Sequence, residues 1–162
     1  MSPLFMTAGR VFDTVESSHT AEPVMNHKEA YPEGYISDIL SQVKTIAMVG
    51  ASAKPHRPSH DVLRVLKEQG YNMIPVNPGQ AGGQILGLDV VASLADIDQP
   101  VDMVDVFRVS EALPGIAQEA IDIGARVLWS QLGVYSDEAA RLAEEAGLLV
   151  VMNRCPKIEL LR

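Results

Sequence analysis

The sequence predicts an α/β protein, a doubly wound parallel sheet with helices on both faces, folded as a single three-layer domain. From about residue 35 onward, short apolar runs alternate with amphipathic stretches about ten residues long, the pattern of right-handed βαβ units. The first of these runs, 46–49, is continuous, which is typical of a strand buried on both faces of a parallel sheet. The 162 residues, 47% apolar and 21% charged, suffice for one domain with a sizeable core.

Residues 1–34 fall outside this pattern because they show neither helical nor strand periodicity. Proline and glycine interrupt them at Pro3, Gly9, Pro23, Pro32 and Gly34. We therefore expect residues 1–34 to form an N-terminal tail, flexible or lying on the surface, and residues 35–162 to form the folded domain. An arm that mediates contact between subunits is the alternative for this tail.

The predicted domain opens with a helix, a strand and a second helix. Apolar residues at helical spacing over 35–43 predict a short amphipathic helix. The continuous apolar run 46–49, closed by Gly50, predicts a buried strand. After a loop, Ser59 is expected to cap the second helix, which Gly70 ends in a left-handed conformation.

The second strand is predicted over 71–76. Pro75 within it points to a sheet edge or a strand end, because proline cannot donate to the hydrogen-bond ladder. The elements predicted after it are a short third strand at 87–91, a helical turn at 93–97, strands at 103–107, 127–129 and 148–152, a helix that Gly124 ends and a helix from Ser136 to Gly147. The sheet is therefore expected to have five or six parallel strands.

Composition excludes several classes of function. The 21 acidic against 13 basic side chains give a net charge of −8, the wrong sign for a protein held on nucleic acid by phosphate contacts. No apolar run approaches the roughly 18 residues of a membrane-spanning helix. The single cysteine and the lack of a signal-like N-terminus indicate a cytoplasmic protein. A monomer and a weak homodimer both stay open, and so does an unidentified protein partner.

Basic residues gather where a ligand site is expected. In an open parallel sheet, ligands bind outside the carboxyl ends of the strands. Half of the ten Lys and Arg residues from position 45 onward lie in the loops that follow predicted strands: Lys54, Arg57, Arg108, Arg154 and Lys157. In an acidic chain this local change of sign favours an anionic, phosphorylated ligand.

The loop after the first strand departs from the dinucleotide fingerprint G-x-G-x-x-G. It begins Gly50, Ala51, Ser52 and has no second or third glycine. The second strand ends in Asn77 and Pro78, where an NAD enzyme usually carries an acidic residue for the ribose. A phosphorylated nucleotide is thus favoured over NAD. An NAD(P)-dependent oxidoreductase stays as an alternative.

Six stretches from about Tyr35 to the C-terminus carry a family resemblance together and in order: 46–52, 70–78, 93–97, 101–108, 129–134 and 150–159. They resemble the small CoA-binding proteins of the YccU-like family. That family is similar to the nucleotide-binding domain of the succinyl-CoA ligase α subunit, a Rossmann-like fold. The resemblance implies that the chain binds coenzyme A or an acyl-CoA, and we expect a non-catalytic or regulatory module.

The resemblance also implies which residues bind the cofactor. They are Gly50, Ala51, Ser52, Lys54, Arg57, Ser59, Asn77, Pro78, Phe107, Arg108, Gln131 and Gly133. The charge pattern agrees, because coenzyme A carries a 3′-phosphate as well as a pyrophosphate. We expect Lys54 and Arg57 to bind phosphates, with Ser52 and the amides of Ser59 and His60 assisting. Asn77 and Arg108 are candidates for the ribose phosphate or the adenine edge.

No catalytic residue or metal site is assigned from the sequence. The four histidines lack a cysteine or carboxylate at ligand spacing, and Asp102 and Asp105 are expected to be strand-end carboxylates. Cys155 is a redox candidate, because it follows the last strand between Arg154 and Lys157, and cations favour the thiolate. Such a thiolate would attack CoA disulfide and form a mixed disulfide with coenzyme A, releasing the second CoA as its thiolate. The alternative is a buried cysteine packed as a small apolar side chain.

Overall fold

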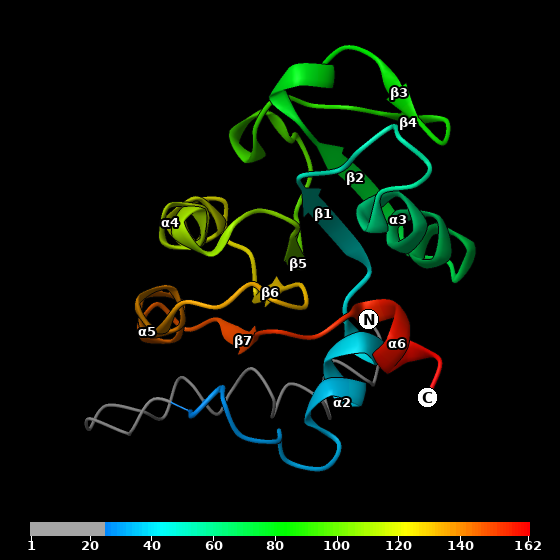
Figure 1. Cartoon of the computed structure of the whole chain (residues 1–162). Coiled ribbons are helices and arrows are strands. Elements are labelled where there is room, and N and C mark those ends of the chain that lie inside the picture. Colours follow the sequence, from blue (N-terminus) through cyan, green and yellow to red (C-terminus); the bar gives the residue numbers. More distant parts are fainter. Residues whose placement is uncertain (1–24) are drawn as a thin grey trace.

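The computed structural model describes residues 25–162 and contains a three-layer α/β domain (Figure 1). Five parallel strands lie in the order β2-β1-β5-β6-β7. Their bounds are β1 Thr45–Val49, β2 Asn72–Val76, β5 Met103–Val106, β6 Val127–Ser130 and β7 Leu149–Val151. One face carries α4 (Leu113–Asp122) and α5 (Asp137–Glu145); the other carries α2 (Tyr35–Gln42), α3 (Pro58–Glu68) and α6 (Pro156–Leu160). The predicted fold class is confirmed.

The chain reverses direction across the sheet between β1 and β5. From β1 it moves outward to β2, then crosses to β5 and continues to β6 and β7. Val49 is in register with Val76 on one side and with Val106 on the other, so the three strands end level. The loops that leave β1, β2 and β5 therefore start side by side, at the position where open parallel sheets bind ligands.

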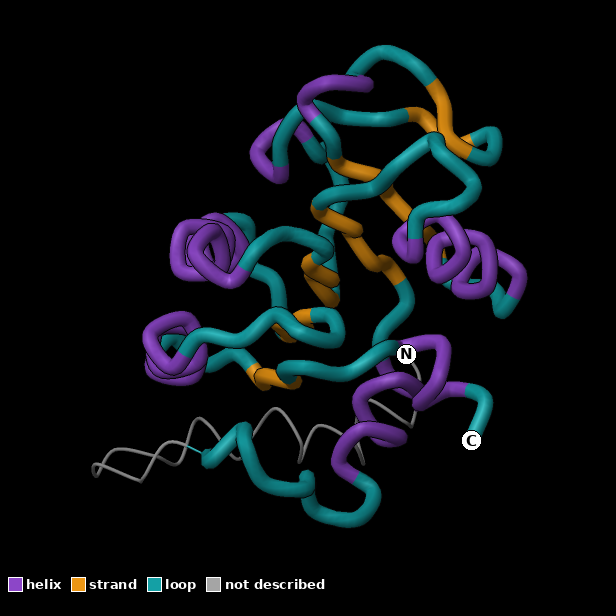
Figure 2. The backbone as a smooth tube through the Cα atoms, viewed as in Figure 1, coloured by secondary structure: helices purple, strands orange, loops and turns teal. Residues whose placement is uncertain are grey.

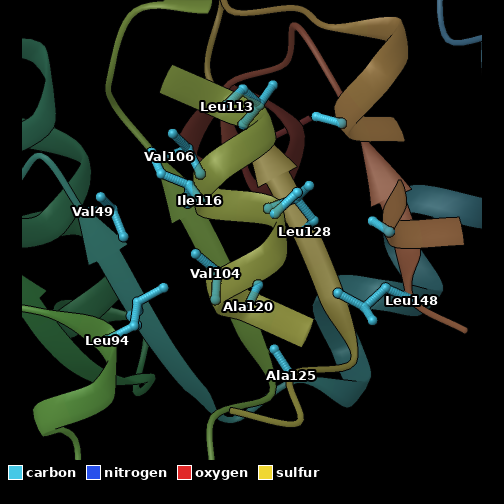
Figure 3. Close-up of a cluster of buried hydrophobic side chains, with 14 of the residues drawn as sticks. Val49, Leu94, Val104, Val106, Leu113, Ile116, Ala120, Ala125, Leu128 and Leu148 are labelled. Atoms are coloured by element: carbon cyan, nitrogen blue, oxygen red, sulfur yellow. The ribbon is translucent and has the colours of Figure 1, made fainter. Parts of the chain in front are cut away.

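Two apolar layers hold the helices on the sheet. Val104 and Val106 of β5 pack beneath α4, where Ile116 is buried (Figure 3). The opposite face buries Met48 and Trp129 beneath α2, α3 and α6. The indole Nε1 of Trp129 donates to the carbonyl of Arg154 at 2.9 Å, which satisfies its polar atom in the core.

The short strand predicted at 87–91 forms only at Leu88–Asp89, and its expected place in the main parallel sheet is wrong. This strand is β4 (Leu88–Asp89), which pairs with β3 (Gln84–Ile85) in a separate antiparallel hairpin. Leu86 and Gly87 both have positive φ, 52° and 76°, which is the geometry of a tight two-residue turn. Only Val91 reaches the main sheet, through a single bridge to Val76. Three short 3₁₀ helices complete the connections: η1 Pro78–Gln80, η2 Leu94–Asp96 and η3 Ser110–Ala112.

Pro75 lies on an edge strand, as the sequence predicts. The Pro75 carbonyl accepts from the amide of Val91 at 3.1 Å, so its nitrogen also faces the outer side of β2. The missing N–H therefore costs no hydrogen bond to β1. The helix α6 was not predicted, because five residues carry too little periodicity to mark a helix.

The described part of the expected tail, residues 25–34, runs as a loop beside β7 (Figure 2). The amide of Met152 donates to the Tyr31 hydroxyl at 2.7 Å, and the amide of Val150 donates to the Tyr35 hydroxyl at 3.2 Å. The two hydroxyls thus hydrogen-bond to backbone groups along the open edge of β7. Residues 1–24 lie outside the described residues, and the domain boundary after residue 34 stays a prediction. Between residues 25 and 162, no helix has the length and apolar character to cross a bilayer.

Candidate functional site

Gly50 fixes the geometry at the carboxyl end of β1. Its φ is +91°, and a Cβ atom added there would lie 2.4 Å from the carbonyl oxygen of Phe107 and 3.2 Å from Cδ of Arg108. Its amide donates to Val76 O at 3.0 Å, and Phe107 N donates to Val49 O at 2.8 Å. Only glycine fits this junction. The structure thus brings Gly50, Phe107 and Arg108 together, as expected.

The loop after Gly50 folds back on itself before α3. The Lys54 amide donates to Ser52 Oγ at 3.1 Å, and the Arg57 amide donates to Lys54 O at 3.0 Å. The Ser52 hydroxyl proton is left to donate elsewhere. The side chains of Lys54 and Arg57, both in this loop, are exposed to solvent.

The helix α3 presents an open N-terminus to this loop. The sequence expectation that Ser59 caps it is wrong, since α3 begins at Pro58 and its N-cap residue is Arg57. Proline suits the first helical position because its φ is already helical and its missing N–H has no intrahelical acceptor there. Ser59 is instead buried within the first turn. No side chain of residues 25–162 caps α3. The His60 amide, expected to assist in phosphate binding, already donates to Arg57 O at 3.0 Å. The Ser59 amide has no backbone partner within residues 25–162, and it lies at the positive end of the helix dipole, which favours an anion.

Asn77 connects the loop after β2 to the loop after β1 by hydrogen bonds. Its Nδ2 donates to Ala51 O at 2.7 Å, its Oδ1 accepts from the Gly79 amide at 2.8 Å, and its backbone amide donates to Val91 O at 2.9 Å. The neighbouring Pro78 is exposed and opens η1. In this arrangement the Asn77 side chain shapes the loop, and one proton of its Nδ2 is left for a ligand.

The loop after β6 forms the far side of the site. The Gln131 amide donates to Val106 O at 3.1 Å, while its buried Oε1 has no hydrogen-bond partner among residues 25–162. Gly133 has a φ of +82°, and its amide donates to Asn153 Oδ1 at 2.7 Å. Asn153 was not among the predicted residues. Asn153 has a φ of +58°. The signal in the sequence is an asparagine just after a strand, because asparagine tolerates the left-handed region better than most residues.

The five cations of the strand-end loops divide into two groups. Lys54, Arg57 and Arg108 are exposed and make no ion pair within the described part of the chain. Lys157 Nζ instead bonds Asp61 Oδ2 at 2.5 Å. Arg154 donates to Asn153 O at 2.9 Å and lies over the Tyr31 ring, 5.0 Å from its centroid. Three of the five cations are therefore left without a charged partner among residues 25–162.

Cys155 is 6% exposed and packs into the apolar layer beneath α2, α3 and α6. Its two flanking cations turn toward Asp61 and toward backbone carbonyls, as given above. The geometry matches a buried cysteine that packs as a small apolar side chain.

Two aspartates of the region have different places in the fold. Asp102 accepts from the amides of Lys44 and Thr45 at 2.9 and 3.0 Å, at the amino ends of the strands and away from the site. Asp105 lies inside β5, in register with Met48 and Trp129, and is fully buried. Neither of its carboxyl oxygens has a hydrogen-bond partner in the described structure. Burial raises the pKa of Asp105 to about 8, so the side chain is mostly protonated at neutral pH.

No group of three His, Cys, Asp or Glu side chains in residues 25–162 is arranged to hold a metal ion. The chemistry that these residues offer is anion binding at the α3 N-terminus, with cations on two sides of it.

Comparison with known proteins agrees with this geometry. Residues 44–160 match the model of a family described as the CoA binding domain. The chain belongs to this family. The match runs from the residue before β1 to the end of α6, and it includes all the predicted cofactor residues.

Two known proteins and one solved structure are similar to this chain. It is 44% identical over 123 residues to the Bacillus subtilis strain 168 protein YneT, covering 76% of this chain and 90% of that one. A structure from Pyrococcus horikoshii OT3 superposes with a TM-score of 0.78 at 36% identity, covering 87% of this chain and 98% of that one. An ADP-forming acetate–CoA ligase II of Archaeoglobus fulgidus is 28% identical over 103 residues, which are 62% of this chain but 15% of the ligase.

Proposed function

We propose that this chain binds coenzyme A, free or acylated, at the carboxyl ends of β1, β2, β5 and β6, as a binding or regulatory module and not as an enzyme by itself. The observation that carries the proposal is the uncapped N-terminus of α3, beside cations that make no ion pair within residues 25–162, in a chain of net charge −8. A multiply phosphorylated ligand suits this site, and the family is a CoA-binding one.

In this proposal the phosphates lie at the turn from Gly50 into α3. Lys54 and Arg57 bind the pyrophosphate together with the Ser59 amide and the Ser52 hydroxyl. Arg108 reaches the ribose phosphate or the adenine from the next loop, since its stem lies beside Gly50. Asn77 and Pro78 support the same end of the ligand from the β2 side.

The loops after β5 and β6 suit the less polar part of the cofactor. Val109 and Leu132 are 63% and 52% exposed, and both lie in these loops. The Ser110 hydroxyl joins the two loops, since it accepts from the Tyr135 amide at 3.0 Å. They offer an apolar path for the pantetheine arm beside Gln131 and Gly133.

The site has binding groups but no nucleophile paired with a base in the described residues. Its one buried acid, Asp105, has no exposed surface. The acetate–CoA ligase match covers only a small part of that protein. We therefore infer that this chain binds the cofactor and that any reaction belongs to a partner. We also propose that it is cytoplasmic, with no need of nucleic acid or membrane.

Thermal unfolding with coenzyme A, dephospho-CoA, acetyl-CoA, NAD and NADH tests the proposal. A ligand at 100 times its Kd stabilises by about 2.7 kcal/mol, and each kcal/mol raises Tm by about 2–4 °C at this size. We expect coenzyme A and acetyl-CoA to raise Tm, and dephospho-CoA to raise it less. A shift with NADH alone would favour the oxidoreductase alternative and contradict the proposal.

A further inference from the structure

A carboxylate lies close to the site proposed for phosphates. Asp61 is the fourth residue of α3, three residues after Pro58. At about 1.5 Å per residue it lies only about 4.5 Å along the helix axis from the N-terminal residue. An ionised carboxylate at that distance repels a bound phosphate, because it lies well within the Debye length of about 8–10 Å.

The carboxylate of Asp61 is held by two cations. Lys157 Nζ bonds its Oδ2 at 2.5 Å and Arg64 Nη2 bonds its Oδ1 at 2.6 Å. These hydrogen bonds, that from Lys157 first, lower the pKa of Asp61, so the side chain is ionised at neutral pH. Neutralising its charge therefore depends on the cations around it.

Arg64 does not neutralise Asp61 alone. The same guanidinium also bonds Glu68, at 3.0 Å to Oε1 and 3.2 Å to Oε2. Arg64 and Lys157 together balance the two carboxylates Asp61 and Glu68. Without Lys157, the cluster of Asp61, Arg64 and Glu68 along α3 carries one uncompensated negative charge.

Lys157 comes from a distant part of the chain. It belongs to α6, which packs against α3 (Figure 1), and it lies 96 positions from Asp61 in the sequence. Its ammonium group is directed to a carboxylate and not to the open end of α3. Lys157 is thus paired with a carboxylate, whereas the side chains of Lys54 and Arg57 make no ion pair in residues 25–162.

We propose that Lys157 sets the affinity of the phosphate site by neutralising Asp61, without touching the ligand itself. This inference rests on the proposed function. The predicted loss on removing Lys157 comes from the exposed charge of Asp61, so it disappears when Asp61 is also made neutral.

The test is a double-mutant cycle for coenzyme A binding, measured by titration calorimetry at low salt. We expect Lys157→Met to raise the Kd by about threefold to tenfold, since one charge near a multiply charged ligand acts through a partly screened medium. Asp61→Asn leaves the Kd unchanged or lowers it. The double variant Lys157→Met with Asp61→Asn returns the Kd to the value of Asp61→Asn alone.

Lys67→Met is the matched control. It removes the same charge from the other end of α3, where Lys67 Nζ bonds the Leu86 carbonyl at 2.8 Å. Nine residues of helix place it about 13.5 Å along the axis from Pro58. We expect no change in Kd. All the variants should fold, because Asp61 and Lys157 are 40% and 35% exposed and such pairs add little stability.

Two results would overturn the inference while the proposed function stands. One is a Kd for coenzyme A in Lys157→Met that equals the wild-type Kd. The other is a loss in Lys157→Met that Asp61→Asn does not restore, which means that Lys157 contacts the ligand directly. A wild-type protein that binds no coenzyme A would overturn the proposed function, and this inference with it.

Discussion

A Cβ atom on Gly50 would lie 2.4 Å from the carbonyl oxygen of Phe107. This close approach occurs where the chain reverses across the sheet, between the ends of β1 and β5. It places the loop that leads into α3 directly beside Arg108. The candidate site therefore depends on the absence of a side chain at one position.

Gly50→Ala is expected to destabilise the fold and weaken coenzyme A binding. The new methyl group meets backbone, which cannot rotate away, and the residue keeps a φ near +91°. We expect a loss of at least about 2 kcal/mol in the free energy of unfolding.

Gly70→Ala is the control for the backbone strain alone, because Gly70 has a φ of +98° and nothing within 4 Å of the added Cβ. Denaturant unfolding of both variants gives the comparison. An equal loss at the two positions would contradict the role of the Phe107 contact.

Arg57→Ala and Arg108→Ala are each expected to raise the Kd for coenzyme A by about tenfold, the value of one charge-assisted hydrogen bond. Arg141→Ala removes the same charge from an exposed position on α5, on the other face of the sheet, and should leave the Kd unchanged. Titration calorimetry at two salt concentrations measures all three. Unchanged affinity in both site variants would contradict the phosphate assignment.

Asp105→Asn is expected to stabilise the protein near neutral pH. The pKa of Asp105 is about 8 in the folded protein against 3.8 as its ordinary value. The folded protein therefore holds a proton that the unfolded chain has released between about pH 4 and pH 8. Unfolding releases it, so stability falls as pH rises through this window, by up to about 1.4 kcal/mol per pH unit.

Denaturant unfolding from pH 5 to pH 8 checks this prediction. The asparagine variant lacks the titrating group, so its stability should depend less on pH and exceed that of the wild type at pH 8. Parallel pH profiles for the two proteins would show that Asp105 is already ionised in the fold.

Tyr31→Phe is expected to lower the free energy of unfolding by about 1–3 kcal/mol. The change removes the acceptor of the Met152 amide at 2.7 Å and leaves that group unpaired at the edge of β7. Tyr135→Phe is the control, since its hydroxyl bonds the exposed Asp137. Chemical unfolding should separate the two variants. An equally small effect of both would mean that water satisfies the β7 edge.

Local patterns in the sequence predict the sheet and much of the site. Short apolar runs predict all five strands of the main sheet, Pro75 predicts an edge or a strand end, and Gly50 is predicted to close the first strand. The close approach of the Phe107 backbone to Gly50 was not predicted. These features depend on neighbouring residues and on the general rules of parallel sheets. The family resemblance, confirmed over residues 44–160, adds the cofactor class.

The features that escaped prediction depend on contacts between distant parts of the chain. Lys157 finds Asp61 across 96 positions, and Tyr31 finds Met152 across 121. No local pattern indicates either pair. The hairpin turn at Leu86 escaped for another reason, because leucine at positive φ is not a turn signal.

Hydrogen–deuterium exchange with and without coenzyme A tests the central claim most directly. We predict slower exchange, on ligand binding, of the amides of Asn77 and of the non-proline residues in 50–60, 107–108 and 131–133, with residues 25–43 unchanged. Protection confined to residues 25–43 and α6, or no protection at a saturating concentration of coenzyme A, would contradict binding at the strand ends.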